Sequence, residues 1–147
     1  MARTLRNPWS VAMSLLELTE IALTSGAWDE ARCNLMEMLP IVRDLGLRSV
    51  AEPVLRQSSE LAAAVAEAAQ AARWSAAATA LQSAMGSKRQ PERDRANHAA
   101  IMARVQETLG SQAFAQVIAE GHALDYESAL AEAQAWLEDP ARWAHRI

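Results

Sequence analysis

The apolar residues of this chain recur at spacings of three and four, which is the period of one face of an α-helix. These stripes are separated by glycine, proline or polar turns. Their members are Val11, Leu15, Leu18 and Ala22; Ala31, Leu35, Met38, Val42 and Leu45; Trp74, Ala77, Ala78, Leu81 and Met85; Ile101, Val105 and Leu109; and Ala129, Leu130, Ala133, Trp136 and Leu137. No strand-like alternation of period two is sustained, so the pattern predicts an all-α chain.

Glycine and proline mark the expected helix ends. Glycine takes the left-handed conformation beyond a helix end at little steric cost. We therefore interpret all the glycines as helix stops, namely Gly26, Gly46, Gly86, Gly110 and Gly121. Asn7-Pro8 is typical of an N-cap followed by proline in the first turn, Pro91 opens a later helix, and Asp139-Pro140 closes the last one. The expected helices lie near residues 8–25, 27–45, 50–66, 68–85, 91–109, 112–120 and 125–138.

Two segments are less regular. Pro40 lies inside the second helix, where the missing N–H is expected to kink or shorten it. Residues 61–85 contain neither glycine nor proline. One long helix and a hairpin with a turn near Ala66–Ala69 both fit that stretch. The other connections are mostly a few residues long, which favours antiparallel helical hairpins.

One of these turns resembles a tetratricopeptide repeat. In the run from Ser25 to Ala31, Gly26 ends a first helix, Trp28 plugs the space between helices, and Ala31 admits a neighbouring helix. A degenerate second unit aligns through Ala71. The resemblance implies a right-handed superhelix of about seven helices in one domain, residues 1–147. Its parts would be a clear hairpin at 8–45, a degenerate hairpin at 50–85, and C-terminal capping helices at 91–138.

The C-terminal part is similar to the ending of large bacterial regulators of the LuxR/MalT-like and AfsR-like type and of related signalling ATPases. It has a Leu109-Gly110 stop, a helix bearing Phe114, a Glu120-Gly121 turn and an amphipathic last helix after Asp125. In that family tetratricopeptide-like repeats follow an ATPase module. The resemblance implies a non-catalytic regulatory tail that binds a protein or peptide, with a small regulatory ligand as the other option.

Composition narrows the partner classes. The net charge of −4 argues against direct nucleic-acid binding, which needs a cationic face. Cys33 is the lone cysteine, so neither an internal disulfide nor a thiolate metal site is expected, which fits a reducing cytoplasm. No apolar run approaches the ~20 residues of a membrane span, so we expect no membrane partner.

The chain carries no recognisable catalytic pattern. His98, His122 and His145 are not at metal-ligand spacing, and no serine lies in a G-x-S-x-G elbow. We therefore expect no catalytic, cofactor-binding or metal-binding residues, no cofactor and no enzymatic activity. Trp28, Trp74 and Trp136 lie on apolar stripes and are expected to anchor the core.

The repeat register predicts which residues would meet a partner. Tetratricopeptide superhelices bind on a concave surface lined by the first helix of each repeat. In this chain that surface would carry Leu16, Glu20, Arg56 and Glu60. The alternative is a structural capping or oligomerisation domain with no ligand of its own, in which case a homodimer is the partner.

Overall fold

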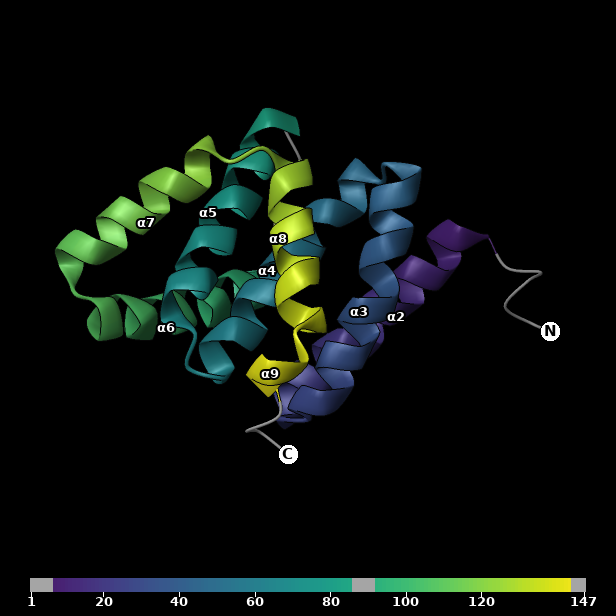
Figure 1. The fold of residues 1–147 in the computed structure, drawn as a ribbon, viewed down its shortest axis with the longest axis horizontal. Helices are drawn as coiled ribbons and strands as arrows, with labels where there is room; N and C mark the ends of the chain where they lie inside the picture. Colours follow the sequence, from purple (N-terminus) through teal and green to yellow (C-terminus); the bar gives the residue numbers. More distant parts are fainter. Residues whose placement is uncertain (1–6, 86–91, 144–147) are drawn as a thin grey trace.

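The computed structural model describes residues 7–85 and 92–143, and all regular structure in these ranges is helical. The all-α prediction is therefore confirmed. The helices shown in Figure 1 are α2 (Pro8–Ser25), α3 (Trp28–Leu45), α4 (Arg48–Ala64), α5 (Ala68–Met85), α6 (Glu92–Leu109), α7 (Ser111–Ala123), α8 (Tyr126–Glu138) and α9 (Pro140–Trp143). The stops expected at Gly86 and Pro91, and the histidine His145, lie outside the described residues.

Local signals explain the first helix boundaries. The Asn7 side chain accepts a hydrogen bond from the Trp9 N–H at 2.8 Å, as expected of an N-cap. Gly26 ends α2 in the left-handed conformation with φ 79°, and Gly46 ends α3 in the same way with φ 61°. Pro40 does not shorten α3, which continues to Leu45.

The glycine-free stretch 61–85 is a hairpin. Helix α4 ends at Ala64 and α5 begins at Ala68. Ala66 between them has φ 67°, a conformation that costs an alanine roughly 1–2 kcal/mol. The turn is closed by the Glu67 N–H, which donates to the Ala62 carbonyl at 2.8 Å. A left-handed alanine thus takes the place of the glycine found in the other two turns.

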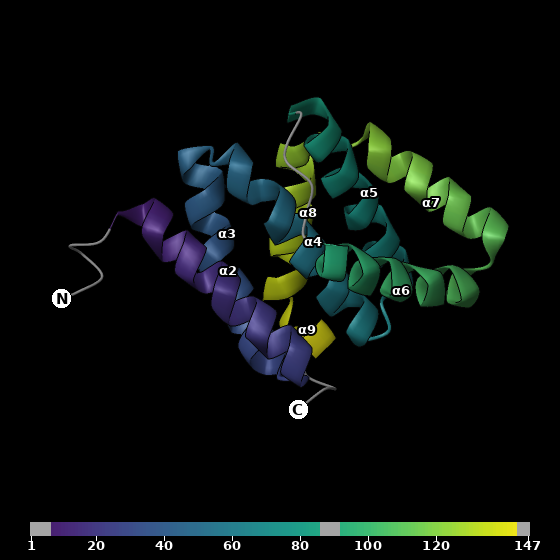
Figure 2. The ribbon, with the colours of Figure 1, turned by 180° about the vertical axis from the view of Figure 1, so that it is seen from behind.

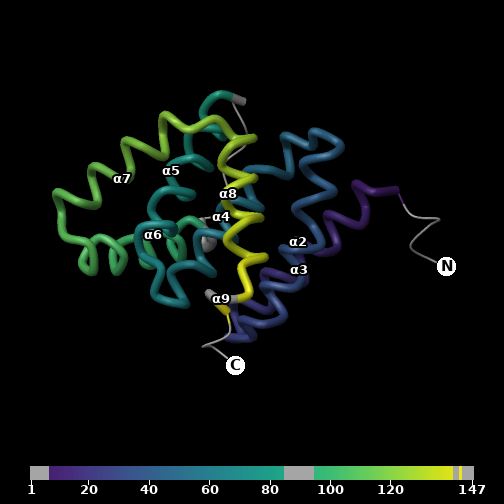
Figure 3. Tube along the Cα trace, in the orientation of Figure 1, coloured from purple at the N-terminus to yellow at the C-terminus, as the bar shows by residue number. Residues whose placement is uncertain are grey.

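The helices form two hairpins with a C-terminal part folded over them. Helix α2 packs against α3, and α4 packs against α5. Helix α4 also contacts both α2 and α3. Helix α7 runs along α5, while α8 contacts α3, α4 and α5 and so covers the first two hairpins, as the trace in Figure 3 shows. In the described ranges, no helix is both long enough and apolar enough to cross a membrane.

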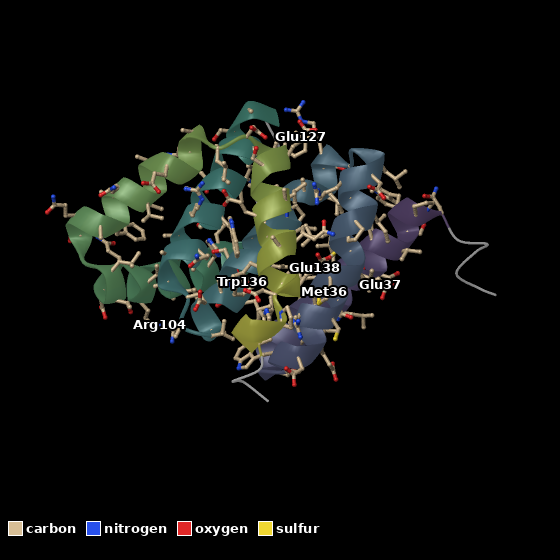
Figure 4. The ribbon with its side chains drawn as sticks, in the orientation of Figure 1. Met36, Glu37, Arg104, Glu127, Trp136 and Glu138 are labelled. Atoms are coloured by element: carbon tan, nitrogen blue, oxygen red, sulfur yellow. The ribbon has the colours of Figure 1, made fainter. Side chains whose placement is uncertain are left out.

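Three tryptophans anchor the C-terminal part to the core. Trp74 and Trp136 meet edge to face with ring centroids 5.3 Å apart. Trp136 and Trp143 do the same at 4.9 Å, and the Trp143 indole N–H donates to the Trp136 carbonyl at 3.0 Å. Arg32 of α3 lies over the Trp143 ring. Figure 4 shows Trp136 where α8 faces α5. The core roles expected of Trp74 and Trp136 are confirmed.

Some residues of the expected stripes are not buried. Trp28, Leu18 and Leu45 are 37%, 52% and 52% exposed. Helix α2 instead buries Leu16 and Thr19, because it packs against α4 as well as α3 and its buried face is therefore wider than one stripe. The expected core position of Trp28 and the outward position of Leu16 were both wrong.

Gly121 does not stop a helix. It lies inside α7, which continues to Ala123, and it is buried. A Cβ atom there would stand 2.7 Å from the Ala76 Cβ and inside van der Waals contact of the Arg73 carbonyl oxygen. The glycine is thus used for close approach of α7 to α5 rather than for a turn.

Candidate functional site

A groove of about 670 Å³ opens between α2 and α6, with α4 beneath it. Figure 2 shows α2 and α6 diverging on the same face of the molecule, with α4 between them. This volume lies in the ~300–1,000 Å³ range of ligand pockets. The lining residues are Glu20, Leu23, Thr24, Trp28, Arg56, Glu60, Ala63, Ala64, Ala66, Ala68, Asn97, Ala100, Ile101, Arg104, Val105 and Thr108.

The groove has a charged end and an apolar end. Helix α4 contributes Arg56 and Glu60 and then, one turn further on, Ala63 and Ala64. Helical periodicity places these residues on one face, since they are spaced by about one turn. The groove therefore offers both apolar contact area and polar groups that can orient a ligand.

Arg56 stands at the centre of the charged end. Its guanidinium nitrogens lie 3.8 Å from Glu20, 3.7 Å from Glu52 and 3.9 Å from Glu60. Direct N–H···O hydrogen bonds are ~2.7–3.2 Å long, so these are loose ion pairs. The Arg56 side chain is only 12% exposed, and its buried Nε has no hydrogen-bond partner among the residues that the structure describes. A buried donor left unpaired in this way costs free energy.

Gln57 sets the position of Glu20. Its buried amide donates to the Leu16 carbonyl at 3.0 Å and to the Glu20 carboxylate at 3.4 Å. These bonds tie α4 to α2 across the floor of the groove. Leu16 therefore contributes a backbone carbonyl beneath the groove, while its side chain is buried in the core.

His98 attaches α6, the other wall, to the bundle. Its Nδ1 lies 2.9 Å from a Glu60 oxygen, and its Nε2 lies 2.8 Å from the Ser75 hydroxyl. Serine, histidine and carboxylate follow one another here in the order of a hydrolytic triad. However, Ser75 is 7% exposed and is not part of the groove lining. Ser75 also lies inside α5, where the backbone N–H groups already donate to carbonyl groups of the helix and are not available to a substrate. The network positions α6 and Glu60.

The position of Glu52 beside Arg56 is buried, and this changes the acidity of the Glu52 carboxyl. Burial raises the pKa of the Glu52 carboxyl above its ordinary value, and the neighbouring Arg56 and His98 offset part of that rise. Glu60 adds to the rise through like-charge repulsion. The floor therefore holds more acidic groups than its one arginine neutralises.

A second polar cluster outside the groove links α5 to α7 and α8. Arg73 donates from Nε and Nη2 to the two Glu132 oxygens, each at 2.8 Å, and from Nη1 to Glu120 at 3.3 Å. The Trp74 indole N–H also donates to Glu132 at 3.3 Å. The hydrogen bonds from Arg73 lower the pKa of the Glu132 carboxyl. The polar groups of this cluster are hydrogen-bonded within it, so the cluster joins α5 to α7 and α8.

Three of the four expected binding residues line the groove. Glu20, Arg56 and Glu60 come together at the charged end of the groove, although their role in binding stays a prediction. Sequence reasoning missed Trp28 and His98 as parts of this site. Trp28 follows the turn after α2 and lines the groove together with residues of α4 and α6. The sequence around Trp28 does not indicate that these helices lie beside it. The contacts of His98 join three helices, and no local spacing signals such a contact.

In the described part of the chain, no group of three or more His, Cys, Asp or Glu residues is placed so that it could hold a metal ion. Cys33 is exposed.

The chain matches no model of a known protein family, no curated protein and no solved structure.

Proposed function

We propose that this protein is a non-catalytic binding module that holds a protein or peptide segment in the groove between α2 and α6. The observation that carries the proposal is the composition of the groove. Apolar side chains from both walls lead to a charged end, where Arg56 lies among loose ion pairs and the Glu20 carboxylate is 42% exposed. Pockets that bind specifically combine these two features, area for affinity and a few polar groups for orientation.

The helix contacts support a tetratricopeptide-like arrangement for the first two hairpins. Helix α4 contacts both α2 and α3, as expected when the first helix of one repeat packs against both helices of the previous repeat. Apart from the turn expected at Glu120-Gly121, which lies inside α7, the resemblance at the C-terminal end favours a regulatory tail of a larger bacterial transcriptional regulator or signalling ATPase in the cytoplasm. Helices α6 and α7 would then act as a cap that also forms one wall of the groove.

The test compares two substitutions on the same helix. Ala100 and Ala103 are both exposed on α6, but only Ala100 lines the groove. Helical peptides are selected from a display library against the protein, and their sites are mapped by amide NMR shifts. Binders should map to α2, α4 and α6. Ala100→Trp should abolish their binding while Ala103→Trp leaves it unchanged. Binders that map elsewhere, or that ignore Ala100→Trp, would refute the proposal.

One observation favours the alternative of an oligomerisation domain. Leu18 and Ile21 are 52% and 64% exposed on the outer face of α2. Exposed apolar pairs of this kind occur at subunit contacts. Sedimentation velocity over a wide concentration range decides between the two. A dimer that Leu18→Glu and Ile21→Glu dissociate would support this alternative, whereas a monomer at all concentrations would reject it.

A further inference from the structure

The length of the groove limits its occupant. The α6 wall extends from Asn97 to Thr108, which is about 17 Å at 1.5 Å per residue, or roughly three helical turns. Polar side chains lie at both ends of this wall, and Ile101 and Val105 lie between them. Walls made of two helices are the usual receptor for an amphipathic helix that inserts residues at i, i+3/4 and i+7.

The opposite wall has the same character. Leu23 and Trp28 line the groove on the α2 side, next to the alanines at the end of α4. Alanine leaves room for larger side chains of a partner. An occupant therefore needs an apolar face toward this end of the groove.

The charge of the floor selects the polar part of the occupant. Glu20, Glu52 and Glu60 surround Arg56, so three carboxyl groups face one permanent cation. Glu60 already accepts from His98. Glu20 is the accessible carboxylate, because its side chain is 42% exposed and only Gln57 donates to it among the described residues. A ligand carboxylate would meet repulsion here, whereas an ammonium or guanidinium group would find a partner.

Arg104, the other cation of the lining, does not cancel this preference. It is exposed on α6, and Figure 4 shows it at the outer edge of the molecule. Water and salt screen exposed charges strongly, while charges that are mostly buried are screened much less. The charge at the floor therefore decides which group enters the groove.

Resting on the proposed function, we infer that the groove receives an amphipathic helix of about three turns from a partner protein, with one lysine or arginine side chain that pairs with Glu20. The apolar face of that helix would lie between Ile101 and Trp28. The basic side chain would reach the charged end, where the second oxygen of the Glu20 carboxylate can accept its hydrogen bond.

The probe is a side-chain-bridged helical peptide with leucines at positions i, i+4 and i+7 and one variable position beside them, occupied by Lys, Gln or Glu. Affinities are measured by fluorescence anisotropy with the whole protein at low salt. The Lys peptide should bind about fivefold more tightly than the Gln peptide, the factor given by ~1 kcal/mol from a half-exposed ion pair. The Glu peptide should bind most weakly.

Two variants make the outcome decisive. Glu20→Gln preserves the acceptor for Gln57 and should remove the preference for Lys, and Glu20→Lys should reverse it toward Glu. Binding that Ala100→Trp blocks but that shows no preference for Lys would overturn this inference and leave the proposed function intact. If Ala100→Trp blocks none of the peptides' binding, or none binds, both are overturned.

Discussion

Gly121→Ala tests the closest helix contact of the fold. Alanine is favoured over glycine inside a helix by about 0.8–1.0 kcal/mol, so local propensity alone predicts that the substitution stabilises α7. The tertiary structure predicts the opposite. The added methyl group would meet the Ala76 Cβ at 2.7 Å and would also press on the Arg73 carbonyl oxygen. A backbone atom cannot rotate away, so α7 has to shift from α5.

The two effects differ in size as well as in sign. Overfilling a close-packed site costs typically ~1–3 kcal/mol, and contact with backbone puts this site at the upper end. After the gain in propensity is subtracted, Gly121→Ala should lower the free energy of unfolding by about 2 kcal/mol. For a domain of this size that corresponds to a melting temperature about 4–8 °C lower.

Urea unfolding followed by circular dichroism measures this difference. The matched control is Ala115→Gly, at an exposed position of the same helix, which reports the propensity term by itself and should cost about 1 kcal/mol. An unchanged or increased free energy of unfolding for Gly121→Ala would refute the close packing of α7 on α5.

Three other substitutions test separate parts of the structure. Ala66→Gly should raise the free energy of unfolding by about 0.5–1 kcal/mol in urea titrations, because it removes the strain of a left-handed alanine at the cost of a more flexible unfolded chain; a loss of stability would contradict the turn. Trp143→Ala should cost about 3 kcal/mol and reduce the near-ultraviolet dichroism, since it removes the last ring of the tryptophan series; a cost below 1 kcal/mol would place that ring outside the core. Glu52→Gln should become increasingly more stable than wild type as pH rises above about 4.3, because a raised folded-state pKa means that ionisation of this carboxyl destabilises the fold from the unfolded pKa upward and fully above the folded pKa. The free energies of unfolding of both proteins, measured from pH 4 to 8, check this. A stability advantage of Glu52→Gln that shrinks as pH rises would contradict the raised pKa of Glu52.

The groove shows how far repeat register can predict a site. Glu20, Arg56 and Glu60 were expected on one surface because equivalent positions of stacked hairpins face the same side. They do meet at one end of the groove. The same register placed Leu16 outward, which is wrong because α2 packs against α4 as well as α3 and the Leu16 side chain is buried.

The sequence by itself determined the helices and most of their ends. Helical periodicity, the N-cap at Asn7 and the left-handed glycines at Gly26 and Gly46 are local features, and local free energies decide them. The turn at Ala66 was left open because its alanine carries no such signal. The repeat register also did not predict that α8 folds back over the two hairpins.

Only the tertiary structure decided what α6 and Gly121 do. His98 becomes a wall-positioning residue because α6 crosses α4 and α5 at Glu60 and Ser75. Gly121 becomes a packing residue because α7 lies against α5 at Ala76. Contacts between helices depend on how whole faces fit together, and many sequence spacings satisfy the same helix periodicity. For that physical reason local patterns specify the elements, while the crossing of the elements creates the groove.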